Sequence, residues 1–159
     1  MIARAGVLAL ACLGPWLAPL TASAQQPPAA VAAEWGLLGR WAPTCARPPG
    51  PGNTHTTYAA LPNGRVSVTD DDGSGKSTKK PELFDTTKSE IFTASIRADG
   101  VLMISESFAT IRMSRDIWFM KGRDGRRRVL LSRTNGRHWA AEGKVIDTGR
   151  ETLWESRCP

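Results

Sequence analysis

The sequence contains only two histidines that could act as a catalytic base or bind a metal. A serine-based catalyst would need His55 or His138 as its base, with an orienting carboxylate nearby. The sequence contains neither His-Glu-x-x-His nor Gly-x-Ser-x-Gly. We therefore expect no catalytic residue, no metal and no cofactor. A small hydrolase stays open as an alternative, because catalytic triads assemble in space rather than in sequence.

The first 24 residues predict that the chain is exported. Residues 1–24 have the pattern of a signal peptide, with a positive charge at Arg4, a short apolar run and small residues at 22–24. The apolar run is shorter than the roughly 20 residues of a membrane-spanning helix. We expect the chain to be exported, periplasmic or secreted, without a transmembrane segment once Cys12 and the leader are removed. A lipid-modified Cys12 is the alternative.

The two remaining cysteines, Cys45 and Cys158, lie near the two ends of the processed chain. An even pair in an exported protein predicts one disulfide. With both thiols locked, the two histidines cannot complete a zinc site.

One loop imitates two ligand-binding motifs without fulfilling either. Residues 73–77 read Gly-Ser-Gly-Lys-Ser, but Asp70 stands where a phosphate-binding loop needs its first glycine. A calcium loop starting at Asp70 would need a glutamate at its twelfth position, which is Pro81. We expect neither nucleotide nor calcium to bind here.

Turn residues separate β-prone runs along most of the chain. Asx-Gly or Thr-Gly pairs divide these runs and predict hairpins. The pairs are Asn63-Gly64, Asp99-Gly100, Asp124-Gly125, Asn135-Gly136 and Thr148-Gly149. A short helical turn is expected within 31–38, and Pro81 could begin another.

These signals predict an all-β fold, an antiparallel meander closing into an up-and-down barrel of about eight strands. The expected organisation is a signal peptide at 1–24, a flexible lead-in at 25–34 and one domain at 35–159, folded as a monomer. Alternation would place Trp154 and Cys158 on one strand face, with the disulfide turned inward beside an indole.

Positive charge is concentrated late in a chain of formal net charge +6. The 121–137 hairpin could bind an anionic partner, with five candidate residues: Lys121, Arg123, Arg126, Arg127 and Arg128. In an exported protein such a partner is an envelope component rather than nucleic acid. The simpler interpretation is a solvated hairpin edge, where charge discourages pairing between sheets.

Aromatic residues supply a candidate ligand pocket. Core packing is the simpler explanation for most of the tryptophans, but small-ligand sites are largely apolar with few polar groups. The candidates for a pocket wall are Tyr58, Trp118, Met120 and Trp139.

Gly39-Arg40-Trp41 after a short helical turn, with Arg157 late in the chain, resembles the Gly-x-Trp opening of lipocalin and calycin barrels. The resemblance implies that Trp41 closes one barrel end and that Arg157 packs over it, both in structural roles. The chain also resembles small secreted bacterial proteins with a Gly-x-Trp opening, a Cys and Pro-rich loop, and an Arg-Cys ending. No agreed activity comes with that likeness.

Together these features predict an exported, non-catalytic β-barrel that binds a small apolar ligand or serves as an envelope interaction module. One alternative is an inhibitor or cell-wall accessory protein that binds an anionic partner through its 121–137 hairpin. The small hydrolase is the other.

Overall fold

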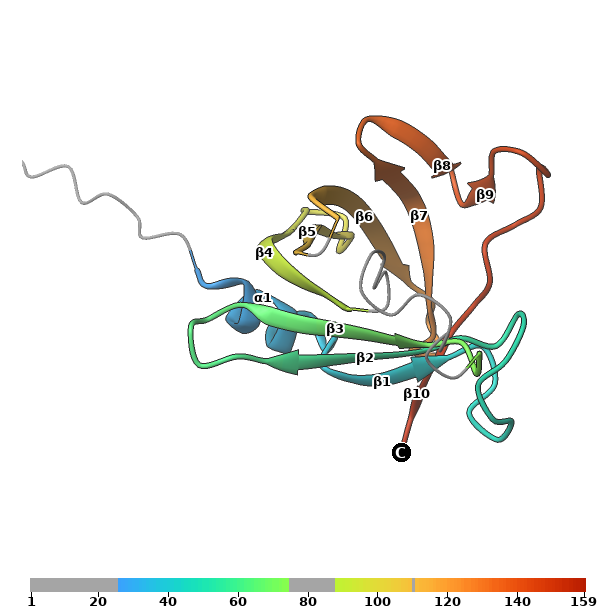
Figure 1. Cartoon of the computed structure of the whole chain (residues 1–159), viewed down its shortest axis with the longest axis horizontal. Helices are drawn as coiled ribbons and strands as arrows, with labels where there is room; N and C mark the ends of the chain where they lie inside the picture. The colour runs from blue at the N-terminus through green and yellow to red at the C-terminus, as the bar shows by residue number, and fades with distance from the viewer. Residues whose placement is uncertain (1–25, 75–87, 110) are drawn as a thin grey trace, which may run out of the picture.

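One antiparallel sheet forms most of this protein (Figure 1). The computed structural model describes residues 26–74, 88–109 and 111–159. Its elements are α1 (Pro28–Trp35), β1 (Gly39–Ala42), β2 (His55–Ala60), β3 (Val66–Asp71), β4 (Lys88–Ile96), β5 (Leu102–Phe108), β6 (Met113–Lys121), β7 (Arg127–Thr134), β8 (Arg137–Ala141), β9 (Lys144–Val145) and β10 (Ser156–Cys158). No helix in these ranges is long and apolar enough to cross a membrane. The signal peptide and the possible helix at Pro81 lie outside the described residues.

The sheet is a meander, as the turn residues predict. Strands β1 to β9 are neighbours in chain order, and β10 returns to pair with β1. At the β2–β3 and β6–β7 turns, Gly64 and Gly125 both adopt φ of +79°. Glycine populates this left-handed region without the steric penalty of a Cβ atom, so these turns form where the sequence places glycine.

The strand number and the edges differ from the expectation of about eight strands in a closed barrel. Over the described ranges the sheet has ten strands, and no ladder of paired strands closes it there. An isolated antiparallel bridge does join Arg127 at the start of β7 to Glu155, the residue before β10. Its two backbone hydrogen bonds measure 2.9 and 2.7 Å. The first and last parts of the meander are therefore linked through the β10 segment.

The segment expected as a flexible lead-in contains α1 instead. Proline stands in its first turn, where its missing N–H has no helical partner to lose, and Gly36 ends it with φ of +80°. Val31, Ala32 and Trp35 are buried, and the helix packs against β3 and β4. Burial of this apolar stripe orders a segment whose prolines and alanines look like a linker in the sequence.

The hydrophobic core lies between α1 and the inner face of the sheet. Its largest side chains come from strands far apart in sequence, which the curled meander brings together. The fully or nearly buried members include Trp41, Tyr58, Val66, Val68, Ile91, Leu102, Ile104, Ile117 and Phe119. The packed helix and sheet thus bury the apolar side chains on one face of the strands in a single core.

The predicted disulfide between Cys45 and Cys158 is confirmed and spans 113 residues. Loss of a native disulfide typically destabilises a fold by about 2–5 kcal/mol. Cys158 is buried, with 7% of its surface exposed, although its cross-strand partner Arg40 is exposed. Partners across an antiparallel pair share a face, so Cys158 lies on the face of β1 and β10 opposite the buried Trp41.

Candidate functional site

Three consecutive arginines in and beside β7 point to different environments. Side chains alternate along a strand, so Arg127 faces the opposite way from Arg126 and Arg128. Arg127 is 1% exposed, whereas Arg126 lies at the surface. A guanidinium buried this deeply needs compensating partners, because an isolated charge away from water is strongly destabilising.

Arg127 finds those partners on the first and last parts of the chain. Its Cζ lies 4.6 Å from the Trp41 ring centroid, 4.7 Å from that of Tyr58 and 4.4 Å from that of Phe119. Its Nη2 lies 2.7 Å from Glu155 Oε2 and donates to the Tyr58 hydroxyl at 3.3 Å. Burial lowers the pKa of Arg127, but the Glu155 charge and these hydrogen bonds raise it above its usual value overall. Arg127 therefore stays a cation inside an aromatic cage.

Burial keeps the Tyr58 side chain uncharged, whereas Arg127 stays charged. Removal from water raises the pKa of its phenol well above the usual value, because the ionised form is disfavoured there. The nearby Arg127 charge opposes this shift without cancelling it. Tyr58 is therefore a neutral hydroxyl that accepts the Arg127 hydrogen bond.

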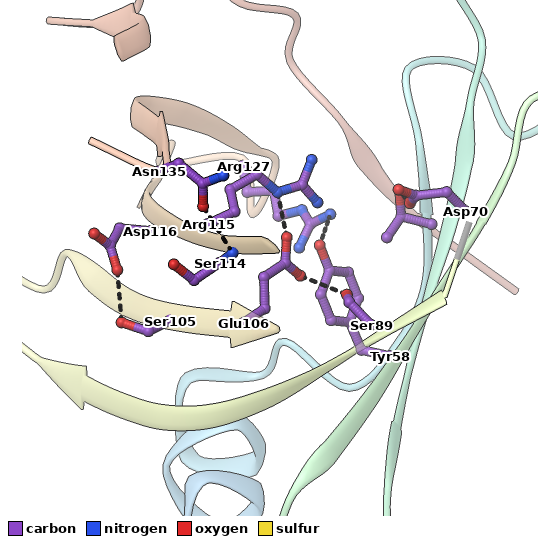
Figure 2. A network of polar contacts seen from close by, with 11 residues as sticks. Tyr58, Asp70, Ser89, Ser105, Glu106, Ser114, Arg115, Asp116, Arg127 and Asn135 are labelled. Atoms are coloured by element: carbon purple, nitrogen blue, oxygen red, sulfur yellow. Dashed lines mark hydrogen bonds and ion pairs between the residues drawn. The ribbon is translucent and has the colours of Figure 1, made fainter. Parts of the chain in front are cut away.

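A second buried ion pair lies in the same interior (Figure 2). Glu106 on β5 is completely buried, and its carboxylate accepts a 2.9 Å hydrogen bond from the Ser89 hydroxyl. The same carboxylate forms an ion pair with Arg115 Nε. Arg115 is partly exposed, with 28% of its side chain open to solvent. It thus connects the buried network to the surface.

The surface that Arg115 reaches is a pocket of about 610 Å³ between β6, β7 and β8. Its lining combines apolar and polar side chains: Arg115, Ile117, Val129, Ser132, Thr134, Arg137, His138, Trp139 and Asp147. We call this the β6–β8 pocket. A register shift in the β6–β7 pairing lets residues three positions apart, Val129 and Ser132, both line it. A β-bulge has this effect because it breaks the two-residue alternation.

The four residues predicted as one ligand wall do not meet. Tyr58 is in the interior beside Arg127, and Trp139 lines the β6–β8 pocket with 53% of its surface exposed. Trp118 lines a different groove, and Met120 lines a hollow beside Trp35. Alternate faces and bulges separate side chains that the sequence places on neighbouring predicted strands.

The five residues of the candidate anionic-partner patch are also divided. Arg127 is interior, so a partner at the surface cannot reach it. Arg126 pairs with Asp124 at 2.6 Å and Arg128 with Glu151 at 3.1 Å. Both guanidinium groups also lie over the Trp154 ring, at 5.7 and 5.0 Å from its centroid. Arg123 is exposed.

Lys121, the fifth member of that patch, has a structural partner. Its ammonium donates to the Trp35 carbonyl and lies 4.4 Å from the Trp35 ring centroid. A cation at the last carbonyls of a helix interacts favourably with the helix dipole. Burial, and then the neighbouring Arg157 charge, lower the pKa of Lys121.

The arginine stacked over Trp41 is Arg127. Arg157 is exposed and is the cross-strand partner of Trp41, with its guanidinium beside Gly39. A Cβ atom at Gly39 would lie 3.0 Å from Arg157 Nε, so the glycine makes room for this side chain. Sequence reasoning missed the role of Arg127. Its alternation with two charged neighbours was the available signal, but the aromatic partners on β1, β2 and β6 were not apparent.

The two histidines lie apart. His55 begins β2, is 6% exposed, and has its Nε2 3.1 Å from the Arg47 carbonyl oxygen. His138 lines the β6–β8 pocket with Ser132 and Asp147, but no hydrogen bond joins any two of these three. Within the described ranges, no cluster of three His, Cys, Asp or Glu residues could hold a metal ion.

No protein-family model matches the chain, and neither a curated protein nor a solved structure shows significant similarity to it.

Proposed function

We propose that this protein is an exported, non-catalytic binding protein that holds a small, largely apolar ligand in the β6–β8 pocket. The observation that carries the proposal is the pocket itself, which is of the size of small-ligand sites and borders the Arg115–Glu106 pair. Ile117, Val129 and Trp139 supply apolar walls, and Arg115 fixes one side through Glu106.

The polar lining suggests how a ligand would be oriented. Arg115 uses its Nε atom on Glu106, and its guanidinium has further N–H donors for a ligand in the pocket that it lines. Arg137 and His138 lie on the β8 side of the same pocket. A ligand with an apolar body and one polar group fits this lining better than a pure hydrocarbon, because the polar side chains would otherwise lose water without a partner.

The same proposal includes a lipocalin-like barrel. The Arg127–Glu155 bridge supports it, because it brings β7 next to the segment that pairs with β1. The Arg127 side chain crosses the same interior to Tyr58 on β2. In this arrangement β1 to β7 and β10 surround the core, and β8 and β9 extend beyond it as one wall of the pocket.

The Cys45–Cys158 disulfide supports export, since such bonds persist in oxidising compartments. The basic hairpin is a weaker candidate for the main function. Three of its five candidate cations already pair with carboxylates of the same chain, through Glu155, Asp124 and Glu151.

Binding of the neutral fluorophore N-phenyl-1-naphthylamine tests the proposal. We expect saturable fluorescence enhancement that falls at least about tenfold in affinity in Trp139→Ala, in keeping with loss of a well-packed aromatic contact. Trp118→Ala is the matched control, because it removes a tryptophan that does not line this pocket. Absence of saturable binding, or equal loss in both variants, would contradict the proposal.

A further inference from the structure

A second groove lies on the outer face of the sheet, away from the β6–β8 pocket. It measures about 400 Å³ and crosses β4, β5, β6 and β7. Its lining consists of Thr93, Ser95, Met103, Ile104, Ser105, Asp116, Trp118, Leu131 and Arg133. We call it the outer groove.

The outer groove is built as two neighbouring rows of cross-strand partners. Trp118 pairs with Met103 on one side and with Leu131 on the other, which gives an apolar row centred on an indole. Two residues earlier on β6, Asp116 pairs with Ser105 and with Arg133, which gives a polar row. Cross-strand partners share a face, so the two rows lie side by side and are held by the backbone register.

The polar row is fixed by its own hydrogen bonds. Asp116 accepts from the Ser105 hydroxyl at 2.8 Å and from Arg133 at 2.7 and 3.2 Å. The bonds from Arg133 and Ser105 lower the pKa of Asp116, so the carboxylate stays ionised. Figure 2 shows Asp116 and Ser105 beside each other, apart from Glu106 and Tyr58.

Accessibility and charge balance narrow the ligand class. Asp116 keeps 32% of its side-chain surface exposed and Arg133 keeps 46%, so both can still bond a ligand. Their charges cancel, and Arg97 at the groove edge pairs with Asp99 at 3.0 Å. A groove without excess charge offers no advantage to a polyanion. It favours a neutral ligand that has both an apolar face and many hydroxyl groups.

A pyranose ring has these two properties. Its C–H face packs against an aromatic ring, whose π face is negative, and its hydroxyls both donate and accept hydrogen bonds. Adjacent hydroxyls can bond a carboxylate and a guanidinium held in one plane. We propose that the outer groove binds a neutral saccharide, with one pyranose on the Trp118 indole and its hydroxyls bonded to Asp116, Arg133 and Ser105.

Arg97 must leave the Trp118 ring before a sugar can pack there. Its Cζ lies 5.5 Å from the Trp118 ring centroid, and 45% of its side chain is exposed. The sugar therefore takes the place of this guanidinium on the ring. The exposed Arg97 side chain is displaced by the sugar, so it does not hold the ligand.

Calorimetric titration of the folded protein with neutral hexasaccharides of glucose, mannose, galactose and N-acetylglucosamine tests the proposal. At least one should bind with a dissociation constant in the millimolar range or tighter. Trp118→Ala should weaken that binding at least about tenfold, as for loss of an aromatic anchor. Asp116→Asn should weaken it by a smaller factor, and Arg97→Ser should leave it equal or tighter.

Controls separate this site from the β6–β8 pocket. Trp139→Ala should lose the naphthylamine probe and keep saccharide binding, whereas Trp118→Phe, which retains an aromatic platform, should bind more tightly than Trp118→Ala. Absence of binding by all four hexasaccharides would overturn the proposal. Equal losses in the Trp118 and Trp139 variants, or a loss in Arg97→Ser as large as in Trp118→Ala, would overturn it too.

Discussion

The inner and outer faces of β6 and β7 both carry arginines that pair with carboxylates, but the pairs differ in their exposure to water. On the inner face, Arg115 and Arg127 bond buried or half-buried carboxylates and reach into the core. On the outer face, Arg126 and Arg133 pair with carboxylates that remain exposed to water. The comparison shows that strand alternation, rather than residue type, decides whether an arginine pairs with a carboxylate in the interior or with one exposed to water.

Arg127→Met should give the largest effect. It removes the cation from the aromatic cage and leaves Glu155 without its partner, for an expected loss of about 3–5 kcal/mol in unfolding free energy. Urea unfolding measured by tryptophan fluorescence checks this. The double variant Arg127→Met/Glu155→Gln should recover part of the loss. Stability unchanged in Arg127→Met would mean that the inner face does not depend on this arginine.

Removal of the disulfide should rank next. Cys45→Ser/Cys158→Ser removes the covalent link between the loop after β1 and strand β10, with an expected loss of about 2–5 kcal/mol in unfolding free energy. Thermal unfolding under non-reducing conditions measures it. The wild-type protein after reduction should show the same lowered melting temperature, and a difference between the two would argue against the disulfide as the cause.

Alkaline pH should reveal the buried phenol. Tyr58 is the single tyrosine of the chain, so tyrosinate absorbance reports it alone. Because burial raises its pKa in the folded state, its contribution to stability is fully present below the unfolded pKa of about 10 and is lost as pH rises above it. Absorbance should therefore rise only together with unfolding.

Tyr58→Phe is the matched variant for that titration. It should lose about 1 kcal/mol at neutral pH, because one hydrogen-bond acceptor of Arg127 disappears. Its stability should fall less steeply between neutral and strongly alkaline pH than that of the wild type. Tyrosinate formation near pH 10 in the folded wild-type protein would show that Tyr58 is accessible to water.

Arg126→Gln should give the smallest effect. Both members of the Arg126–Asp124 pair are half exposed, and water screens such pairs. The melting temperature should not change measurably. A drop comparable with that of Arg127→Met would remove the distinction between the two faces.

The meander was predictable because its turns are local. An Asn-Gly or Asp-Gly pair between β-prone runs specifies a hairpin without reference to the rest of the chain, as at Gly64 and Gly125. The disulfide followed from cysteine parity in an expected exported chain. Helix α1 was only partly foreseen, because the packing of Val31 and Trp35 on the sheet, which adds to the helix propensity of its alanines, is not visible in the sequence.

The sequence did not reveal which candidate residues come together at one site. Register shifts in the β6–β7 and β7–β8 pairings change which residues face inward, so Trp118 and Trp139 lie at different sites. The role of Arg127 depends on aromatic rings from three other strands. Such contacts depend on how the whole sheet curls, which no local sequence pattern contains.

The most direct test of two separate faces is a two-dimensional nitrogen–proton NMR spectrum of the indole N–H groups during titration with N-phenyl-1-naphthylamine. The account predicts that the Trp139 signal shifts progressively while the Trp118 signal stays in place. A shift of Trp118 with Trp139 unchanged would contradict it.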